Sequence, residues 1–208
     1  MWEIFSQLVA QKGGTATEFS QETWSNDTGV RAPDRDGVCG PLTCLWLACQ
    51  KKDGQDFVAN PEREDFVRAV WGMANDMAAG HQGPDGEHFV VTFADHVLKD
   101  CGMKFDNSYT VDGANNFTTE LKNHIAMLPA GYYVVLFRGH SSAFPRGPGG
   151  IAHCVGVDTH QHQFFDPSAG KADFEDLSTL CNFIKAWIDT GYRILADGEC
   201  GVMVRRYV

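Results

Sequence analysis

Residues 37–47 of the chain read Gly37-Val38-Cys39-Gly40-Pro41-Leu42-Thr43-Cys44-Leu45-Trp46-Leu47. A glycine-flanked cysteine stands near the start of this segment, and Pro41 suits the first turn of a helix, where a backbone N–H is not needed. Apolar residues then recur with the spacing of one helix face, at Leu42, Leu45, Trp46 and Cys49. The segment therefore predicts a buried helix over residues 40–52, with Cys39 at its N-terminal end.

Two strand-like blocks follow in the second half of the chain. Residues 150–158 read Gly-Ile-Ala-His-Cys-Val-Gly-Val-Asp, and residues 163–168 read Gln-Phe-Phe-Asp-Pro-Ser. Two antiparallel strands joined by the short turn between these blocks can place His153 beside Asp166. The aspartate can then hold one nitrogen of the imidazole and leave the other for a thiol. The pattern predicts a triad in which Cys39 is the nucleophile, His153 the base and Asp166 the orienting acid.

Each member of this triad has an alternative interpretation. A cysteine at a helix N-terminus meets free N–H groups and the positive end of the helix dipole, which favour the thiolate. Cys39 is also consistent with a core cysteine at a tight turn, and Cys44 is a rival nucleophile farther along the same helix. A lone histidine in an apolar strand, such as His153, is more often a core residue. Asp158 competes with Asp166 as the carboxylate.

Composition limits the classes of function. The chain has 208 residues, of which 43% are hydrophobic, so it can bury the core of one folded domain. Its formal charge of −10 argues against a nucleic-acid partner, which would favour a basic surface. The longest uninterrupted apolar run, residues 132–137, is far shorter than the roughly 20 residues of a membrane span. We therefore expect no nucleic-acid partner and no integral membrane segment, and no Sec-type signal is visible at the N-terminus.

The cysteines and histidines do not predict a metal site. The seven cysteines include no CxxC pair, and several lie in apolar stretches, where a free cysteine behaves as a small buried hydrophobe. The eight histidines include no HExxH motif. Five of the histidines outside the triad lie at turns or in glycine-rich stretches: His81, His88, His140, His160 and His162. We expect neither a metal nor a cofactor.

Helical patterns dominate the first half of the chain and strand-like runs the second. Further helices are predicted at 61–79, 91–98, 118–128 and 174–187, and strands at 132–137, 152–157, 163–166 and 202–208. Residues 1–36 are interpreted as an irregular lead-in. We expect one α+β domain over residues 1–208. A helical N-terminal lobe would carry the nucleophile, and a mainly antiparallel C-terminal sheet would carry His153 and Asp166, with a cleft between them.

The three blocks together resemble those of the YopT/AvrPphB family of bacterial effector cysteine proteases, within the papain-like superfamily. The resemblance rests on Gly37, Cys39, Leu42 and Trp46, on Ala152-His153, and on Phe164-Phe165-Asp166-Pro167 with Gly170 and Phe174. It implies a papain-like fold, with Cys39, His153 and Asp166 in the roles given above. It also implies a protein substrate from a host, and secretion without a Sec signal into the cytoplasm of a host cell.

One departure from the family pattern concerns the oxyanion hole. Papain-like enzymes usually carry a Gln or Asn about five or six residues before the cysteine, where this chain has Asp34 and Pro33. Proline has no donor, and an ionised aspartate would repel an oxyanion. We therefore expect the second donor to come from the backbone of this loop or from the lead-in, for example from Asn26 or Gln21. Residues 139–150, rich in glycine, are expected to form a wall of the cleft.

Three functions fit these observations. The leading one is a cysteine protease that cleaves a specific host protein through an acyl-enzyme thioester. The alternative is a glutamine deamidase or transglutaminase-like toxin domain that uses the same triad on a side-chain amide. The third is a papain-like interaction module without activity. The missing oxyanion donor favours this last interpretation, and the intact Cys-His-Asp set argues against it.

Overall fold

The computed structural model describes residues 1–30, 38–52, 56–80, 86–112, 123–124, 127–140, 151–191 and 199–208. Its helices are α1 (Trp2–Gln11), α2 (Gln21–Thr28), α3 (Cys39–Lys51), α4 (Glu64–Gly80), α5 (Gly86–Asp100) and α7 (Leu177–Gly191). Its strands are β1 (Thr15–Glu18), β2 (Phe105–Asp112), β3 (Tyr132–His140), β4 (Ile151–Asp158), β5 (Gln163–Asp166), β6 (Gly170–Asp173) and β7 (Glu199–Tyr207). No helix among these residues is long and apolar enough to cross a membrane.

The described strands form one antiparallel sheet. Their order is β1-β6-β5-β4-β3-β7-β2, and each neighbouring pair runs antiparallel. β4 lies in the middle of the sheet and pairs with β3 on one side and β5 on the other. The strand that carries His153 therefore lies directly beside the strand that ends at Asp166.

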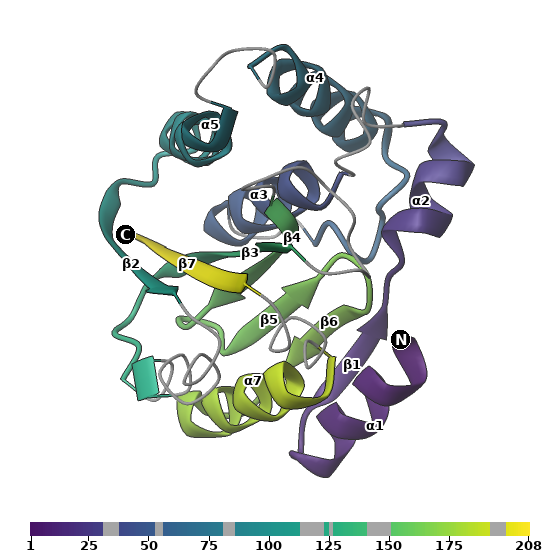
Figure 1. Cartoon of the computed structure of the whole chain (residues 1–208). Helices are drawn as coiled ribbons and strands as arrows, with labels where there is room; N and C mark the ends of the chain where they lie inside the picture. The colour runs from purple at the N-terminus through teal and green to yellow at the C-terminus, as the bar shows by residue number, and fades with distance from the viewer. Residues whose placement is uncertain are drawn as a thin grey trace.

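Helices cover both faces of this sheet. Figure 1 shows α3, α4 and α5 on one face and α1 and α7 on the other. Because side chains alternate along a strand, β3 contributes to both layers. Val134 and Leu136 pack in the core on the α3 side, whereas Val135 and Phe137 pack in the core on the α7 side. The continuous apolar run of residues 132–137 is thus a strand buried on both faces.

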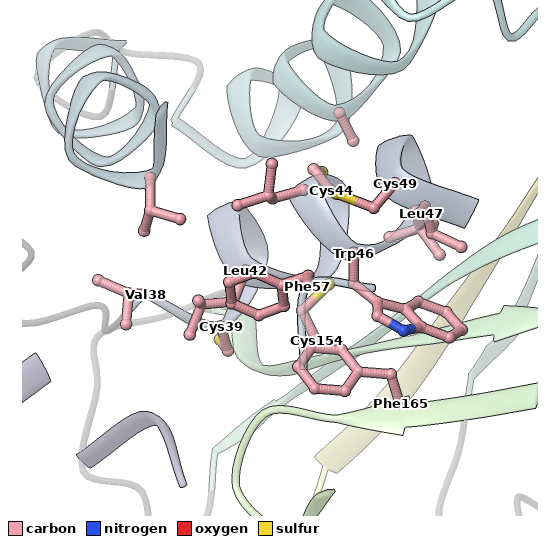
Figure 2. Close-up of a cluster of buried hydrophobic side chains, with 14 of the residues drawn as sticks. Val38, Cys39, Leu42, Cys44, Trp46, Leu47, Cys49, Phe57, Cys154 and Phe165 are labelled. Atoms are coloured by element: carbon pink, nitrogen blue, oxygen red, sulfur yellow. The ribbon is translucent and has the colours of Figure 1, made fainter. Parts of the chain in front are cut away.

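Helix α3 packs closely against β4 at a glycine. A Cβ atom at Gly156 would lie 2.8 Å from the ring of Trp46, so a side chain at this position would collide with the helix. Thr43 Oγ1 donates a buried hydrogen bond of 3.2 Å to the carbonyl oxygen of Cys154. Trp46 also stacks on Phe165 of β5, with 5.4 Å between ring centroids (Figure 2). These contacts fix α3 over the two strands that carry the predicted histidine and aspartate.

The prediction of an α+β fold with an antiparallel sheet is confirmed. The predicted helices at 40–52, 61–79 and 174–187 correspond to α3, α4 and α7, and the predicted strands correspond to β3, β4, β5 and β7. Helix α5 is longer than the predicted segment 91–98. Most of the predicted helix 118–128 lies outside the described residues. The sequence pattern misses β2 and β6.

The interpretation of residues 1–36 as an irregular lead-in is wrong for residues 1–30, which form α1, β1 and α2. Strand β1 is short and polar, and it exists because it pairs with β6, a long-range contact that periodicity does not reveal. Helix α2 carries two local signals that could have predicted it. Ser20 Oγ accepts a hydrogen bond from the Thr23 N–H (3.3 Å), and Gly29 ends the helix with a φ of 72°.

Candidate active site

Cys39 is the first residue of α3. The helix begins with a hydrogen bond from the Leu42 N–H to the Val38 carbonyl oxygen, and the Cys39 side chain is 7% exposed. Figure 2 shows Cys39 at the end of the helix, on the side that faces the strands. The N–H groups of the first turn of a helix have no helical acceptor, and they lie at this end of α3. This is the position that the sequence predicts.

His153 lies on β4, opposite Phe137 of β3, and its side chain is buried. Its Nε2 atom is 2.8 Å from Oδ1 of Asp166. The imidazole also forms a hydrogen bond with the Cys39 side chain. Because Nε2 meets the carboxylate, Nδ1 is the nitrogen left for the sulfur. The structure thus brings the three predicted residues into contact in the order Cys39–His153–Asp166.

The surroundings of His153 favour its charged form. Burial alone would lower its pKa, because desolvation disfavours an imidazolium. The charge and hydrogen bond of Asp166 outweigh this effect, and those of Cys39 add to them. Together they raise the pKa of His153 from 6.5 to about 10. The imidazole is therefore protonated at neutral pH and lies between a carboxylate and a sulfur.

Asp166 ends β5, and its carboxylate is fully buried. Oδ1 lies 2.8 Å from Nε2 of His153 and accepts a hydrogen bond of 2.9 Å from the backbone N–H of Ser168. Oδ2 accepts a hydrogen bond of 3.1 Å from the indole Nε1–H of Trp187 on α7. Sequence reasoning does not identify Trp187, because the periodicity of an amphipathic helix does not show where an indole N–H points. Its presence on the apolar face of α7 is the only signal.

The turn after Asp166 explains why a glycine follows four residues later. The Ala169 N–H donates to the Asp166 carbonyl oxygen (2.9 Å), which closes the connection between β5 and β6. Gly170 has a φ of 138°, a conformation that side chains rarely adopt. A Cβ atom there would also lie 2.4 Å from the carbonyl oxygen of Thr17. This tight turn holds the aspartate at the end of β5, where it meets His153.

The two alternative residues, Asp158 and Cys44, have surroundings that differ from those of Asp166 and Cys39. Asp158 ends β4, and its Oδ1 accepts hydrogen bonds from the backbone N–H groups of His160 (2.8 Å) and Gln161 (3.3 Å). It therefore shapes the turn between β4 and β5, and the carboxylate that contacts the imidazole is Asp166. Cys44 lies inside α3 and is 1% exposed. Burial raises its pKa to about 12, so it is a thiol at neutral pH.

The remaining described cysteines are also unreactive by this criterion. Desolvation raises the pKa of four of them, Cys49, Cys101, Cys154 and Cys181. None of the six cysteines whose side chains are described forms a disulfide. Within the same part of the chain, no group of three His, Cys, Asp or Glu side chains is arranged to hold a metal ion.

Two expectations concern residues that the structure leaves undescribed. Positions 33 and 34 and residues 141–150, most of the expected cleft wall, lie outside the described ranges. Of the proposed oxyanion donors, Asn26 is exposed on α2. The Gln21 side-chain amide donates to Ser168 Oγ (2.8 Å), and its backbone N–H donates to the Pro167 carbonyl oxygen (2.7 Å). Gln21 therefore supports the turn that follows Asp166.

Comparisons with known proteins show which solved structures the fold resembles. No protein-family model matches the sequence, and no curated protein matches it. The fold is similar to the crystal structure of the Pseudomonas avirulence protein AvrPphB, with a TM-score of 0.55 and 20% identity over 86% of this chain and 95% of that chain. PatoxP, a cysteine protease-like domain of the Photorhabdus asymbiotica toxin PaTox, gives a TM-score of 0.42 and 12% identity, over 99% of this chain and 57% of that chain. The similarity to AvrPphB confirms the papain-like fold that the motifs imply.

Proposed function

We propose that the protein is a papain-like cysteine peptidase that cleaves a specific host protein, with Cys39 as its nucleophile. The observation that carries this proposal is the contact series Cys39–His153–Asp166, in which a protonated imidazole lies between the sulfur and the carboxylate. A thiolate paired with an imidazolium is an activated nucleophile at neutral pH. The fold shared with AvrPphB supports the same conclusion.

In the acylation step, the Cys39 sulfur attacks the carbonyl carbon of the scissile peptide bond, and an electron pair moves to the carbonyl oxygen. The backbone N–H of Cys39, at the start of α3, is one donor for this oxyanion. The tetrahedral intermediate then collapses and the C–N bond breaks. Nδ1–H of His153 gives its proton to the departing amine, and the acyl group remains on Cys39 as a thioester.

In the deacylation step, the now neutral His153 takes a proton from a water molecule as the water oxygen attacks the thioester. Collapse of the second intermediate releases the carboxylic acid product and expels the sulfur as a thiolate. His153 keeps the proton, which restores the initial ion pair. Asp166 holds Nε2–H of the ring through both steps and does not itself accept the proton.

The same chemistry would serve a glutamine deamidase or transglutaminase, in which the attacked carbonyl belongs to a side-chain amide. The two functions differ in the substrate that reaches the sulfur. The proposal includes delivery of the protein into the cytoplasm of a host cell. This part of the proposal rests on the motif resemblance and on the likeness to an avirulence protein.

The test begins with a host-cell lysate treated with the wild-type protein or with Cys39→Ala. New chain termini that appear only with the wild type support proteolysis. A one-dalton gain at glutamine residues, with intact chains, supports deamidation instead. An irreversible thiol electrophile should form an adduct at Cys39 in the wild type, and Cys44→Ala serves as a matched control that leaves this adduct in place. The absence of any adduct at Cys39 would refute a catalytic role for the triad.

A further inference from the structure

The carboxylate of Asp166 meets hydrogen-bond donors at both of its oxygen atoms. Oδ1 receives the backbone N–H of Ser168 (2.9 Å) and lies 2.8 Å from Nε2 of His153, which carries a proton because the imidazole is in its charged form. Oδ2 receives the indole Nε1–H of Trp187 (3.1 Å). An ionised carboxylate can satisfy this arrangement, because both of its oxygens only accept.

An asparagine at this position cannot satisfy the same donors. Other papain-like enzymes use an asparagine to orient the histidine. If an amide at position 166 turned its oxygen toward His153 and Ser168, its NH₂ group would face the indole N–H of Trp187. If it turned the other way, its NH₂ group would face His153 and Ser168. In either orientation two donors meet in a buried site, which is unfavourable.

The indole cannot easily turn away to relieve this conflict. Trp187 is 1% exposed. Phe5 of α1 packs edge-on against it, with 5.1 Å between ring centroids and an angle of 82°. Phe183 lies parallel to it at 6.4 Å, with an angle of 9°. Side chains from two helices therefore hold the ring with its N–H directed at the carboxylate.

We propose that Trp187 is a positioning residue of the triad and that its indole N–H makes position 166 selective for aspartate over asparagine. This inference rests on the proposed function, because it concerns the residues that orient His153. Trp187 contacts the proposed triad through its indole hydrogen bond to Oδ2 of Asp166. It acts through Asp166 and His153, and it anchors the triad to the helix layer opposite α3.

The test compares four proteins: the wild type, Trp187→Phe, Asp166→Asn and the double variant. The first measurement is the rate of Cys39 alkylation by iodoacetamide at about pH 6, where unpaired thiols react slowly. Loss of the indole donor alone should lower this rate, and Asp166→Asn alone should lower it about tenfold or more. In the Asn background Trp187→Phe should raise the rate about threefold or more, because the amide can then turn its oxygen to His153. A decrease in both backgrounds would overturn the proposal.

A matched control removes an indole hydrogen bond elsewhere. Trp24 is also buried, and its Nε1–H donates to the carbonyl oxygen of Pro61 at 2.8 Å. Trp24→Phe should not raise the alkylation rate of the Asp166→Asn protein. A recovery equal to that given by Trp187→Phe would also overturn the proposal. If Trp187→Phe does not fold, a benzothiophene analogue of tryptophan at position 187 keeps the ring shape and lacks only the donor.

A second measurement separates this inference from the proposed function. The Nε2–H proton of His153, followed by NMR, reports its hydrogen bond to residue 166 without any substrate or any reaction of the thiol. We expect this signal to be lost in Asp166→Asn and to return in the double variant. If the signal behaves in this way and Cys39 does not react, the peptidase proposal fails and the positioning role stands. If Cys39 reacts and the signal does not return, the positioning role fails alone.

Discussion

A buried histidine normally loses its charge, because desolvation disfavours the imidazolium. At His153 this effect is reversed by a carboxylate on one side of the ring and by Cys39 on the other. Asp166 can act in this way because the donors around it keep it in place. The chemistry of the site therefore depends on the order of the three side chains as much as on their identity.

We expect Cys39 to be the most reactive thiol of the chain. Iodoacetamide at about pH 6, followed by peptide mapping, should label Cys39 first, because a thiolate reacts and a buried thiol does not. Cys39→Ala and His153→Ala should each abolish turnover, whereas Asp166→Ala should leave residual activity, since Asp166 orients the base and transfers no proton. Preferential labelling of Cys44 or Cys101 would contradict the assignment. So would a larger loss of activity in Asp158→Ala than in Asp166→Ala, with both proteins folded.

The raised pKa of His153 predicts the pH dependence of the reaction. Acylation needs the protonated ring, so kcat/KM should remain high well above pH 6.5 and fall as the pH approaches about 10. The measurement is a pH–rate profile on a cleaved peptide. Asp166→Asn should move the alkaline limb to lower pH, because it removes the negative charge that raises the pKa. An alkaline limb near pH 6.5 in the wild type would show that the ring is not held in its charged form.

The same shift has a consequence for stability. Between pH 6.5 and about 10 the folded protein binds a proton at His153 that the unfolded chain has lost. The stabilisation from this group is therefore complete below pH 6.5 and disappears as the pH rises through about 10. In urea unfolding, the free energy of unfolding of Cys39→Ala should fall more steeply above pH 6.5 than that of Cys39→Ala/His153→Gln, because Asp166 still raises the pKa of His153 and no thiol proton offsets the effect. Parallel curves for the two proteins would contradict the shift.

At the scale of elements, the helix after Cys39 and the strands that carry His153 and Asp166 are predictable because their signals are local. The helix has an apolar stripe, and the two strands are apolar runs joined by a turn. Strand β1 lacks such a signal, since its residues are mostly polar and exposed and its partner β6 lies far along the chain. Helix α1, by contrast, carries a local signal that could have predicted it, because Phe5, Leu8 and Val9 have the spacing of one helix face.

The contact between α3 and β4 gives a prediction at this scale. Gly156→Ala places a Cβ atom 2.8 Å from the Trp46 ring, so the helix must shift away from the strand. We expect a loss of about 1–3 kcal/mol in the free energy of unfolding, together with slower Cys39 alkylation. Gly72→Ala on α4 is the matched control, because a Cβ atom there meets no atom within 4 Å. It should stabilise the protein by about 0.5–1 kcal/mol, as expected for alanine in a helix. Equal effects of the two changes would rule out the close approach of α3 to β4.

At the scale of the whole molecule, the proposed triad joins the two layers of helices. Cys39 belongs to the core on the α3 side, and Trp187 belongs to the core on the α7 side. The sequence predicts a triad of cysteine, histidine and aspartate because reactive groups stand out within conspicuous local patterns. It does not identify Trp187 on α7, and it names Gln21 on α2 only as an oxyanion donor and not as a support of the turn after Asp166. Both residues reach the site only when the fold brings distant segments together. Supporting residues of this kind are set by the tertiary fold.

The core on the α7 side contains an apolar cavity of about 20 Å³, and this predicts that the two layers respond differently to added volume. Val135 lines the cavity, whereas the adjacent Val134 points to the other core, where it is fully buried. Val135→Ile should fill part of the cavity and stabilise the protein by about 0.5–1.5 kcal/mol. Val134→Ile adds the same methylene to a well-packed core and should destabilise it by about 1–3 kcal/mol. Urea midpoints at unchanged slope measure both effects, and a shift of the same sign in the two variants would show that the cavity does not accept the added group.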